Sequence, residues 1–84
     1  MFKGVVRVLP KEGILDPQGK AVEGALAKLG YDCATNVRSG RYFEISVNAG
    51  SEQEALKTLE EIARRVLSNP VIENFSCTLT EVQK

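Results

Sequence analysis

The sequence contains no histidine and no tryptophan, and it has only two cysteines, Cys33 and Cys77. Without histidine the chain lacks the commonest general base and the commonest metal ligand in proteins. The two cysteines lie far apart and form no C-x-x-C pair, which indicates reduced thiols in a cytosolic protein and not a redox or metal site. We therefore expect no catalytic residue, no metal ligand and no cofactor-binding residue in this chain.

The chain also has no surplus of charge, because 11 Lys and Arg residues balance 11 Asp and Glu residues. Broad electrostatic binding to nucleic acid or to an anionic membrane needs a positive surplus, so neither partner is expected. The first residues lack a signal-peptide pattern, and no apolar run reaches the roughly 18–20 residues that span a membrane. These features predict a cytoplasmic protein.

The length of 84 residues sets the scale of the fold. We expect one domain, residues 1–84, because the chain is too short for a second core. So small a core, with no metal motif and no expected disulfide, gains additional burial most directly from oligomerisation. The chain is therefore predicted to associate with itself as a dimer or a tetramer.

Alternation of apolar and polar residues predicts the strands. Residues 2–9 read as a valine-rich strand with apolar side chains on both faces, and residues 71–82 as a final strand. Residues 34–47 also alternate, around the pair Ser39-Gly40. This segment is either a hairpin with Ser-Gly as its turn or one bent strand with a bulge, and the sequence leaves both open.

Two segments carry helix signals. Asp16 is the expected N-cap of the first helix, Pro17 its first residue and Gly30 the residue that ends it. Ser51 and Glu54 form a capping box that begins the second helix. The apolar positions expected to bury the second helix are Ala55, Leu56, Leu59, Ile62, Ala63, Val66 and Leu67.

The order strand, helix, strand or hairpin, helix, strand predicts an α+β fold. In this fold two helices pack on one face of a small antiparallel sheet of three long or four strands, with a ferredoxin-like topology.

Three segments of the chain together resemble one known family. They are LDPQGKAVEGAL (residues 15–26), VRSGRYFEI (37–45) and LSNPVIENF (67–75). They are similar to the PurS family in order and spacing, and they meet its patterns LDP-x-G-x-x-V, VR-x-G-[KR]-x-x-E and N-x-V-I-E-x-[FY]. PurS is the small subunit of phosphoribosylformylglycinamidine (FGAM) synthase, so the resemblance implies a PurS-like fold.

The resemblance also implies a role in de novo purine synthesis. The family's complex converts formylglycinamide ribonucleotide (FGAR), glutamine and ATP to FGAM. Its large subunit, PurL, binds ATP, Mg²⁺ and the ribonucleotide, and its glutaminase subunit, PurQ, releases ammonia. The small subunit is implied to be inert by itself, to form a dimer or tetramer, to bridge PurL and PurQ, and to aid ammonia transfer. The alternative is a small ferredoxin-like regulatory domain that binds a ligand.

The segment VRSGRYFEI holds the candidate interaction residues. An RNA-binding strand places aromatic residues two apart on one face, whereas Tyr42 and Phe43 are adjacent and point to opposite faces. Gly40 lacks the glycine spacing of a phosphate loop. Arginine and tyrosine are enriched at interface hot spots, so Arg38, Arg41 and Tyr42 are predicted to face a protein partner; solvated arginines beside a turn are the alternative.

Overall fold

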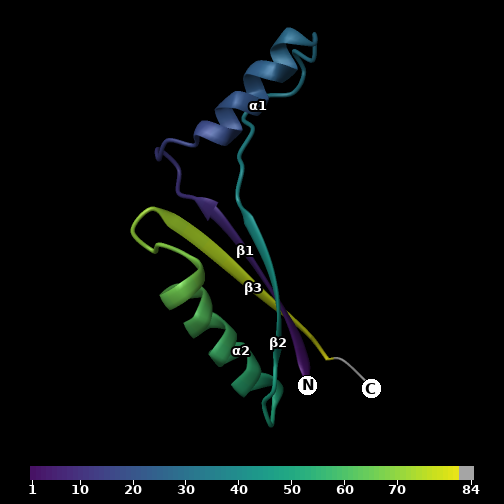
Figure 1. Ribbon diagram of the computed structural model, residues 1–84, viewed down its shortest axis with the longest axis vertical. Helices are drawn as coiled ribbons and strands as arrows, with labels where there is room; N and C mark the ends of the chain where they lie inside the picture. The colour runs from purple at the N-terminus through teal and green to yellow at the C-terminus, as the bar shows by residue number, and fades with distance from the viewer. Residues whose placement is uncertain (82–84) are drawn as a thin grey trace.

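The computed structural model describes residues 1–81. In chain order it contains β1 (Phe2–Pro10), α1 (Pro17–Lys28), β2 (Arg41–Val47), α2 (Glu52–Ile62), a π-helical turn η1 (Ala63–Leu67) and β3 (Glu73–Glu81) (Figure 1). The strands form one antiparallel sheet in the order β2-β1-β3, so β1 lies in the centre. The predicted α+β class is confirmed, and the sheet has three strands.

The segment between the helices is neither a hairpin nor one bent strand. A single strand begins at Arg41, and residues 31–40 before it form no strand. β3 begins at Glu73, two residues later than the sequence predicts, and Val82 at the predicted end lies outside the described residues.

The sheet has two unlike faces, which follow from the alternation along its strands. On the face that α2 covers, Val6 lies between Phe43 of β2 and Cys77 of β3. On the opposite face Arg7 lies between Tyr42 and Ser76. We call the first the covered face and the second the open face, because no element of residues 1–81 packs on the second.

The core lies between α2 and the covered face. Leu59, Val6 and Val8 are the largest fully buried side chains, and they are joined by Val47, Ala55 and Ala63. Gly4 lets the helix approach the central strand, because a Cβ at this position would lie 2.7 Å from Cδ2 of Leu59. The capping and apolar pattern of α2 therefore places this helix as expected.

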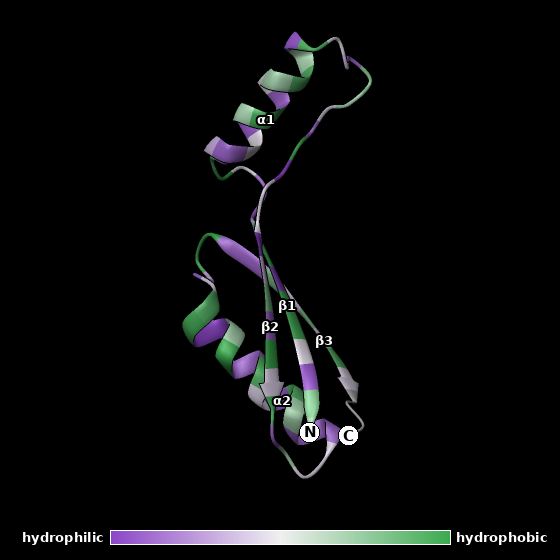
Figure 2. Cartoon of the chain, turned by 45° about the vertical axis from the view of Figure 1, so that its right-hand side comes forward, coloured by the Kyte–Doolittle hydropathy of each residue, from purple (hydrophilic) through white to green (hydrophobic). Residues whose placement is uncertain are grey.

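Both helices were expected to pack on one face of the sheet. Within this chain only α2 does so. The segments on either side of α1 run past the end of the sheet, so α1 lies beyond it (Figure 1) and contributes no residue to the core. Its apolar residues stand apart from the sheet, as the green segments of α1 in Figure 2 show. The molecule is accordingly long and thin, with extents of 51 × 30 × 14 Å. We call residues 11–40, which include α1, the arm.

Candidate interaction site at the neck of the molecule

The arm joins the sheet at a neck, where residues 11–16 enter it and residues 37–40 leave it. Asp16, the N-cap of α1, connects the two segments. Its Oδ1 accepts a hydrogen bond from the N–H of Gly19 at 3.0 Å, and its Oδ2 accepts one from the N–H of Ser39 at 2.8 Å. One carboxylate thus caps the helix and clamps the returning chain.

These hydrogen bonds also favour the ionised form of the Asp16 carboxyl group, which we call the Asp16–Ser39 clamp together with the Ser39 N–H. The Ser39 N–H, and after it the Gly19 N–H, lower the pKa of Asp16 below its ordinary value, because both stabilise the carboxylate form. Arg38, an exposed residue on the returning segment, adds a smaller effect in the same direction. Asp16 therefore remains an anion throughout the neutral range.

Two glycines of the PurS-like patterns make close approaches that a side chain would block. Gly19 is buried, and a Cβ there would lie 2.7 Å from the carbonyl oxygen of Val37 and closer still to the Asp16 carboxylate. A Cβ at Gly40 would clash with the carbonyl oxygen of Val8 and lie 2.7 Å from Cδ2 of Leu9. Both glycines serve the neck by small size, since neither has a positive φ.

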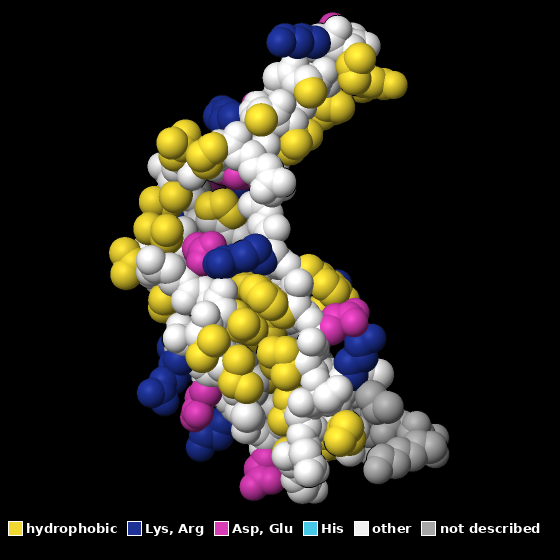
Figure 3. All heavy atoms as spheres, viewed as in Figure 1, with side chains coloured by type: hydrophobic (Ala, Val, Ile, Leu, Met, Phe, Trp, Pro, Cys, Tyr) yellow, Lys and Arg dark blue, Asp and Glu magenta, His cyan; other side chains and the backbone are white. Residues whose placement is uncertain are grey.

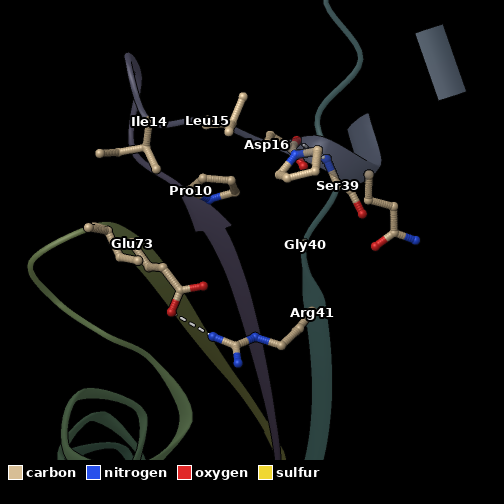
Figure 4. Close-up of a pocket in the computed structure, with 11 residues that line it drawn as sticks. Pro10, Ile14, Leu15, Asp16, Ser39, Gly40, Arg41 and Glu73 are labelled. Carbon is tan, nitrogen blue, oxygen red and sulfur yellow. Dashed lines mark hydrogen bonds and ion pairs between the residues drawn. The ribbon is translucent and has the colours of Figure 1, made fainter. Parts of the chain in front are cut away.

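The third PurS-like segment closes the neck from the sheet side. Glu73 Oε1 accepts hydrogen bonds from Arg41 Nη2 at 2.6 Å and from the Asn69 N–H at 2.8 Å, and the Lys11 N–H donates to the Ile72 carbonyl at 2.8 Å. The three segments therefore meet around one open hollow of about 370 Å³, in which the Arg41–Glu73 ion pair faces the Asp16 end of the arm (Figure 4). Its charged groups are already paired within the chain.

A second carboxylate ties α1 to the returning segment. Glu23 Oε1 accepts a hydrogen bond from the Asn36 N–H at 2.7 Å. Asn36 has a positive φ of 57°. Glu23 also lies 3.8 Å from the ammonium of Lys20. Asp16 and Glu23 therefore fasten the return of the chain along the helix through backbone donors.

The three predicted interface residues differ in their surroundings. Arg38 is exposed on the neck, and Arg41 points to the covered side and pairs with Glu73. Tyr42 is on the open face, where its hydroxyl donates to Glu44 at 3.0 Å and the Arg7 guanidinium lies 5.6 Å from the ring centre. Alternation along β2 turns Arg41 and Tyr42 to opposite faces, but both line one open hollow at the start of the strand, together with Leu9 and Gly40.

The remaining predicted structural residues lie at the helix ends. Gly30 follows the C-cap of α1 with φ 89°, and the Tyr31 N–H reaches the Leu26 carbonyl at 2.9 Å, as in a Schellman motif. Pro17 opens α1 directly after Asp16. Ser51 Oγ accepts from the Glu54 N–H at 3.2 Å, but the Glu54 carboxylate reaches back to the Gly50 N–H at 3.1 Å, one residue before the N-cap.

The described part of the chain has few other groups that could react or bind a metal ion. Cys33 is exposed and Cys77 is half-buried, both are free, and burial raises the pKa of the Cys77 thiol. Residues 1–81 contain no group of three or more acidic or thiol side chains placed to hold a metal ion. Within the same residues no helix has both the length and the apolar character of a membrane span.

Sequence reasoning missed the contacts that join the three segments. It assigned Asp16 only a capping role, and it gave no role to Glu23 or Glu73. The available signal was the joint presence of the segments: an aspartate, two glycines and a glutamate at fixed spacing in otherwise exposed stretches. The sequence cannot show which backbone N–H a carboxylate such as Asp16 or Glu23 accepts from, because every residue except proline offers the same donor.

Comparison with known proteins agrees with this geometry. The family model for PurS, phosphoribosylformylglycinamidine (FGAM) synthase, matches residues 3–81. The FGAM synthase subunit PurS of Bacillus subtilis (strain 168) is 37% identical over 82 residues, which cover 98% of this chain and 96% of the relative.

Solved structures share the same fold. Thermus thermophilus PurS is 36% identical, with a TM-score of 0.86 over 98% of each chain. A chain in the structure of PurLQS from Thermotoga maritima, 23% identical, has a TM-score of 0.85 over 94% of this chain and 96% of that one. These matches confirm the PurS-like fold. Because the likeness in sequence extends over nearly the whole chain, the chain belongs to the PurS family and is a PurS subunit of phosphoribosylformylglycinamidine synthase.

Proposed function

We propose that this chain is the non-catalytic bridging subunit of its FGAM synthase. It holds the synthetase subunit PurL and the glutaminase subunit PurQ together and aids the transfer of ammonia between them. The complex converts FGAR, glutamine and ATP to FGAM in de novo purine (IMP) biosynthesis. ATP and Mg²⁺ belong to the large subunit, and this chain binds no cofactor. It works in the cytoplasm, in keeping with its two free thiols.

The match to the PurS family over residues 3–81 is the observation that carries this proposal. The name PurLQS of the Thermotoga maritima structure supports PurL and PurQ as partners. The polar groups of the neck support a scaffold role, because they already have partners within the chain: Asp16 accepts from the Ser39 N–H, and Glu73 accepts from Arg41 and from the Asn69 N–H. The ligand-sensing alternative has no such support, since these relatives are PurS proteins.

A reconstitution with two nitrogen sources tests the bridging role. Without this chain, glutamine-dependent turnover should be lost while ammonium salts still support part of the rate. Free ammonia reaches the synthetase site from solvent, whereas ammonia released from glutamine needs the two active sites held close together. Full glutamine-dependent activity without the chain would refute the bridge, and ATP hydrolysis by the purified chain would refute its inert character.

The predicted interface residues are tested separately because they lie on opposite sides of the sheet. Tyr42→Ala should weaken assembly with PurL and PurQ if the open face is the docking side, and Arg41→Ala if the covered side is. Either change should alter the stability of the isolated chain by no more than about 1 kcal/mol, since Arg41 and Tyr42 are both exposed. Tyr42→Phe is the matched control, because it keeps the ring under Arg7 and removes only the hydroxyl. If both alanine variants assemble normally, the docking residues lie elsewhere.

A further inference from the structure

A small hollow lies at the start of β2, separate from the larger one at the neck. It has a volume of about 210 Å³, and its lining residues are Arg7, Val8, Leu9, Gly40, Arg41 and Tyr42. We call it the β2 hollow. Leu9 and Tyr42 supply apolar surface and are 40% and 55% exposed. Figure 3 shows apolar side chains and charged side chains of both signs lying together where the sheet meets the arm.

The β2 hollow carries a surplus of positive charge. Its lining includes two arginines and no carboxylate. Arg41 is paired with Glu73, but among residues 1–81 no carboxylate lies within ion-pair distance of Arg7. Glu44, on the same face as Arg7, is itself paired with Lys3 at 3.5 Å. Arg7 is therefore the source of the surplus.

A chain of contacts holds Arg7 in place on the open face. Its guanidinium lies 5.6 Å from the centre of the Tyr42 ring, which is within the range of a cation–π interaction. The Tyr42 hydroxyl in turn donates to Glu44, and the Glu44–Lys3 ion pair ends the chain. A side chain that is already restrained loses less freedom when a partner binds. These contacts therefore lower the entropy cost of using Arg7 in an interface.

The size and the charge of the β2 hollow limit what it can bind. Pockets for small molecules usually have about 300–1,000 Å³ and enclose the ligand, whereas this hollow is smaller and open, so it suits side chains that project from a protein surface. A protein that covers it takes Arg7 out of water, and a buried charge without a partner is costly. Such a protein must therefore bring a carboxylate, together with an apolar side chain that contacts Leu9 and Tyr42.

We propose that the β2 hollow docks an acidic segment of a partner subunit in the FGAM synthase complex. A carboxylate of this segment accepts hydrogen bonds from the Arg7 guanidinium, and an apolar neighbour lies against Leu9 and Tyr42. A second copy of this chain is a poorer occupant, because isologous pairing would bring the same positive surplus to both sides of the contact. The inference rests on the bridging role and adds to it the chemistry of one docking point.

Affinity measurements with purified PurL and PurQ, each titrated against the full chain, test the charge of the partner. Arg7→Gln should weaken the binding of one subunit by about tenfold, as removal of a hot-spot arginine does, and Arg7→Glu should weaken it further by repulsion. Added salt should weaken binding of the unmodified chain more than binding of Arg7→Gln. Arg65→Gln is the matched control, because it removes the same charge at an exposed position outside the hollow.

The outcomes separate this docking point from the bridging role. A loss of affinity confined to PurL or to PurQ supports the inference and identifies the subunit that carries the acidic segment. Unchanged affinity for both subunits in Arg7→Gln and Arg7→Glu would overturn it, as would equal losses in Arg7→Gln and Arg65→Gln. A change in the mass of the isolated Arg7→Gln chain by light scattering would place a second copy in the hollow and also overturn it. The bridging role is measured apart from these, by glutamine-dependent turnover with all subunits at saturating concentration.

Discussion

At the residue scale, Asp16 shows how a single side chain joins two segments of the chain. Its two oxygens accept backbone N–H groups that lie on different segments, Gly19 in the helix and Ser39 on the return. Asp16→Ala should therefore speed hydrogen exchange at the Ser39 amide, because its acceptor is lost. Asp16→Asn keeps one carbonyl oxygen and should give an intermediate effect. Glu12→Ala, at an exposed position nearby, is the control, and unchanged exchange at Ser39 in Asp16→Ala would disprove the clamp.

The same carboxylate makes the neck sensitive to acid. Backbone hydrogen bonds lower its pKa in the folded state below the unfolded value of 3.8, so its contribution to stability is fully present above that value. The contribution is lost as the pH falls through the folded-state pKa. An NMR titration from pH 6 to pH 2 should show the Ser39 amide shift changing with a midpoint below 3.8. Asp16→Asn should abolish this transition, and a midpoint above 3.8 would contradict the assigned cause.

At the scale of elements, the second helix departs from the regular pattern at its C-terminal end. The five residues of η1, Ala63–Leu67, form a π-helical turn, and Ser68 closes it by donating its hydroxyl to the Ala63 carbonyl at 2.7 Å. A π-helical turn holds more residues than an α-helical one, which shifts the side chains that follow around the axis. Val66, expected in the buried stripe, is consequently 74% exposed.

One substitution in α2 and one in η1 should therefore have unequal effects on stability. Leu59→Ala removes a fully buried side chain that packs on Gly4, and it should lower the free energy of unfolding by about 2–5 kcal/mol. Val66→Ala belongs to the same predicted stripe but should change it by less than about 0.5 kcal/mol. Urea unfolding of both variants measures the difference. Similar losses for the two would show that Val66 is buried in solution.

How far the sequence predicts each element depends on where its partners lie. The strands and α2 can be predicted from the alternation of apolar residues and from the Ser51 cap. The apolar side of each of these elements packs on another element of the same chain, so the pattern identifies the buried face. The apolar stripe of α1, formed by Val22, Ala25, Leu26 and Leu29, predicts a buried face equally well, but no element of residues 1–81 covers it. The strand pattern of residues 33–37 has the same ambiguity, and the turn at Ala63 leaves no sequence signal of its own.

At the scale of the whole molecule, the expected self-association makes folding depend on protein concentration. A dimer that unfolds to separate chains is stabilised by mass action, so raising the concentration 100-fold should raise the Tm by several degrees. Leu29→Glu places a charge on the stripe of α1 and should abolish this dependence by giving a monomer. Val71→Glu, at a residue of similar exposure (79% against 73%) on the β3 side, should preserve it. A Tm independent of concentration in the unmodified chain would argue against the dimer.

The neck also has a consequence for how one chain opens. The arm leaves and returns at one end of the sheet, where the Asp16–Ser39 hydrogen bond joins both segments, and it contributes no residue to the core. Movement of the arm can therefore leave the strand pairs and the packing of α2 intact. Within a single chain, the arm can open at a lower free energy than global unfolding requires.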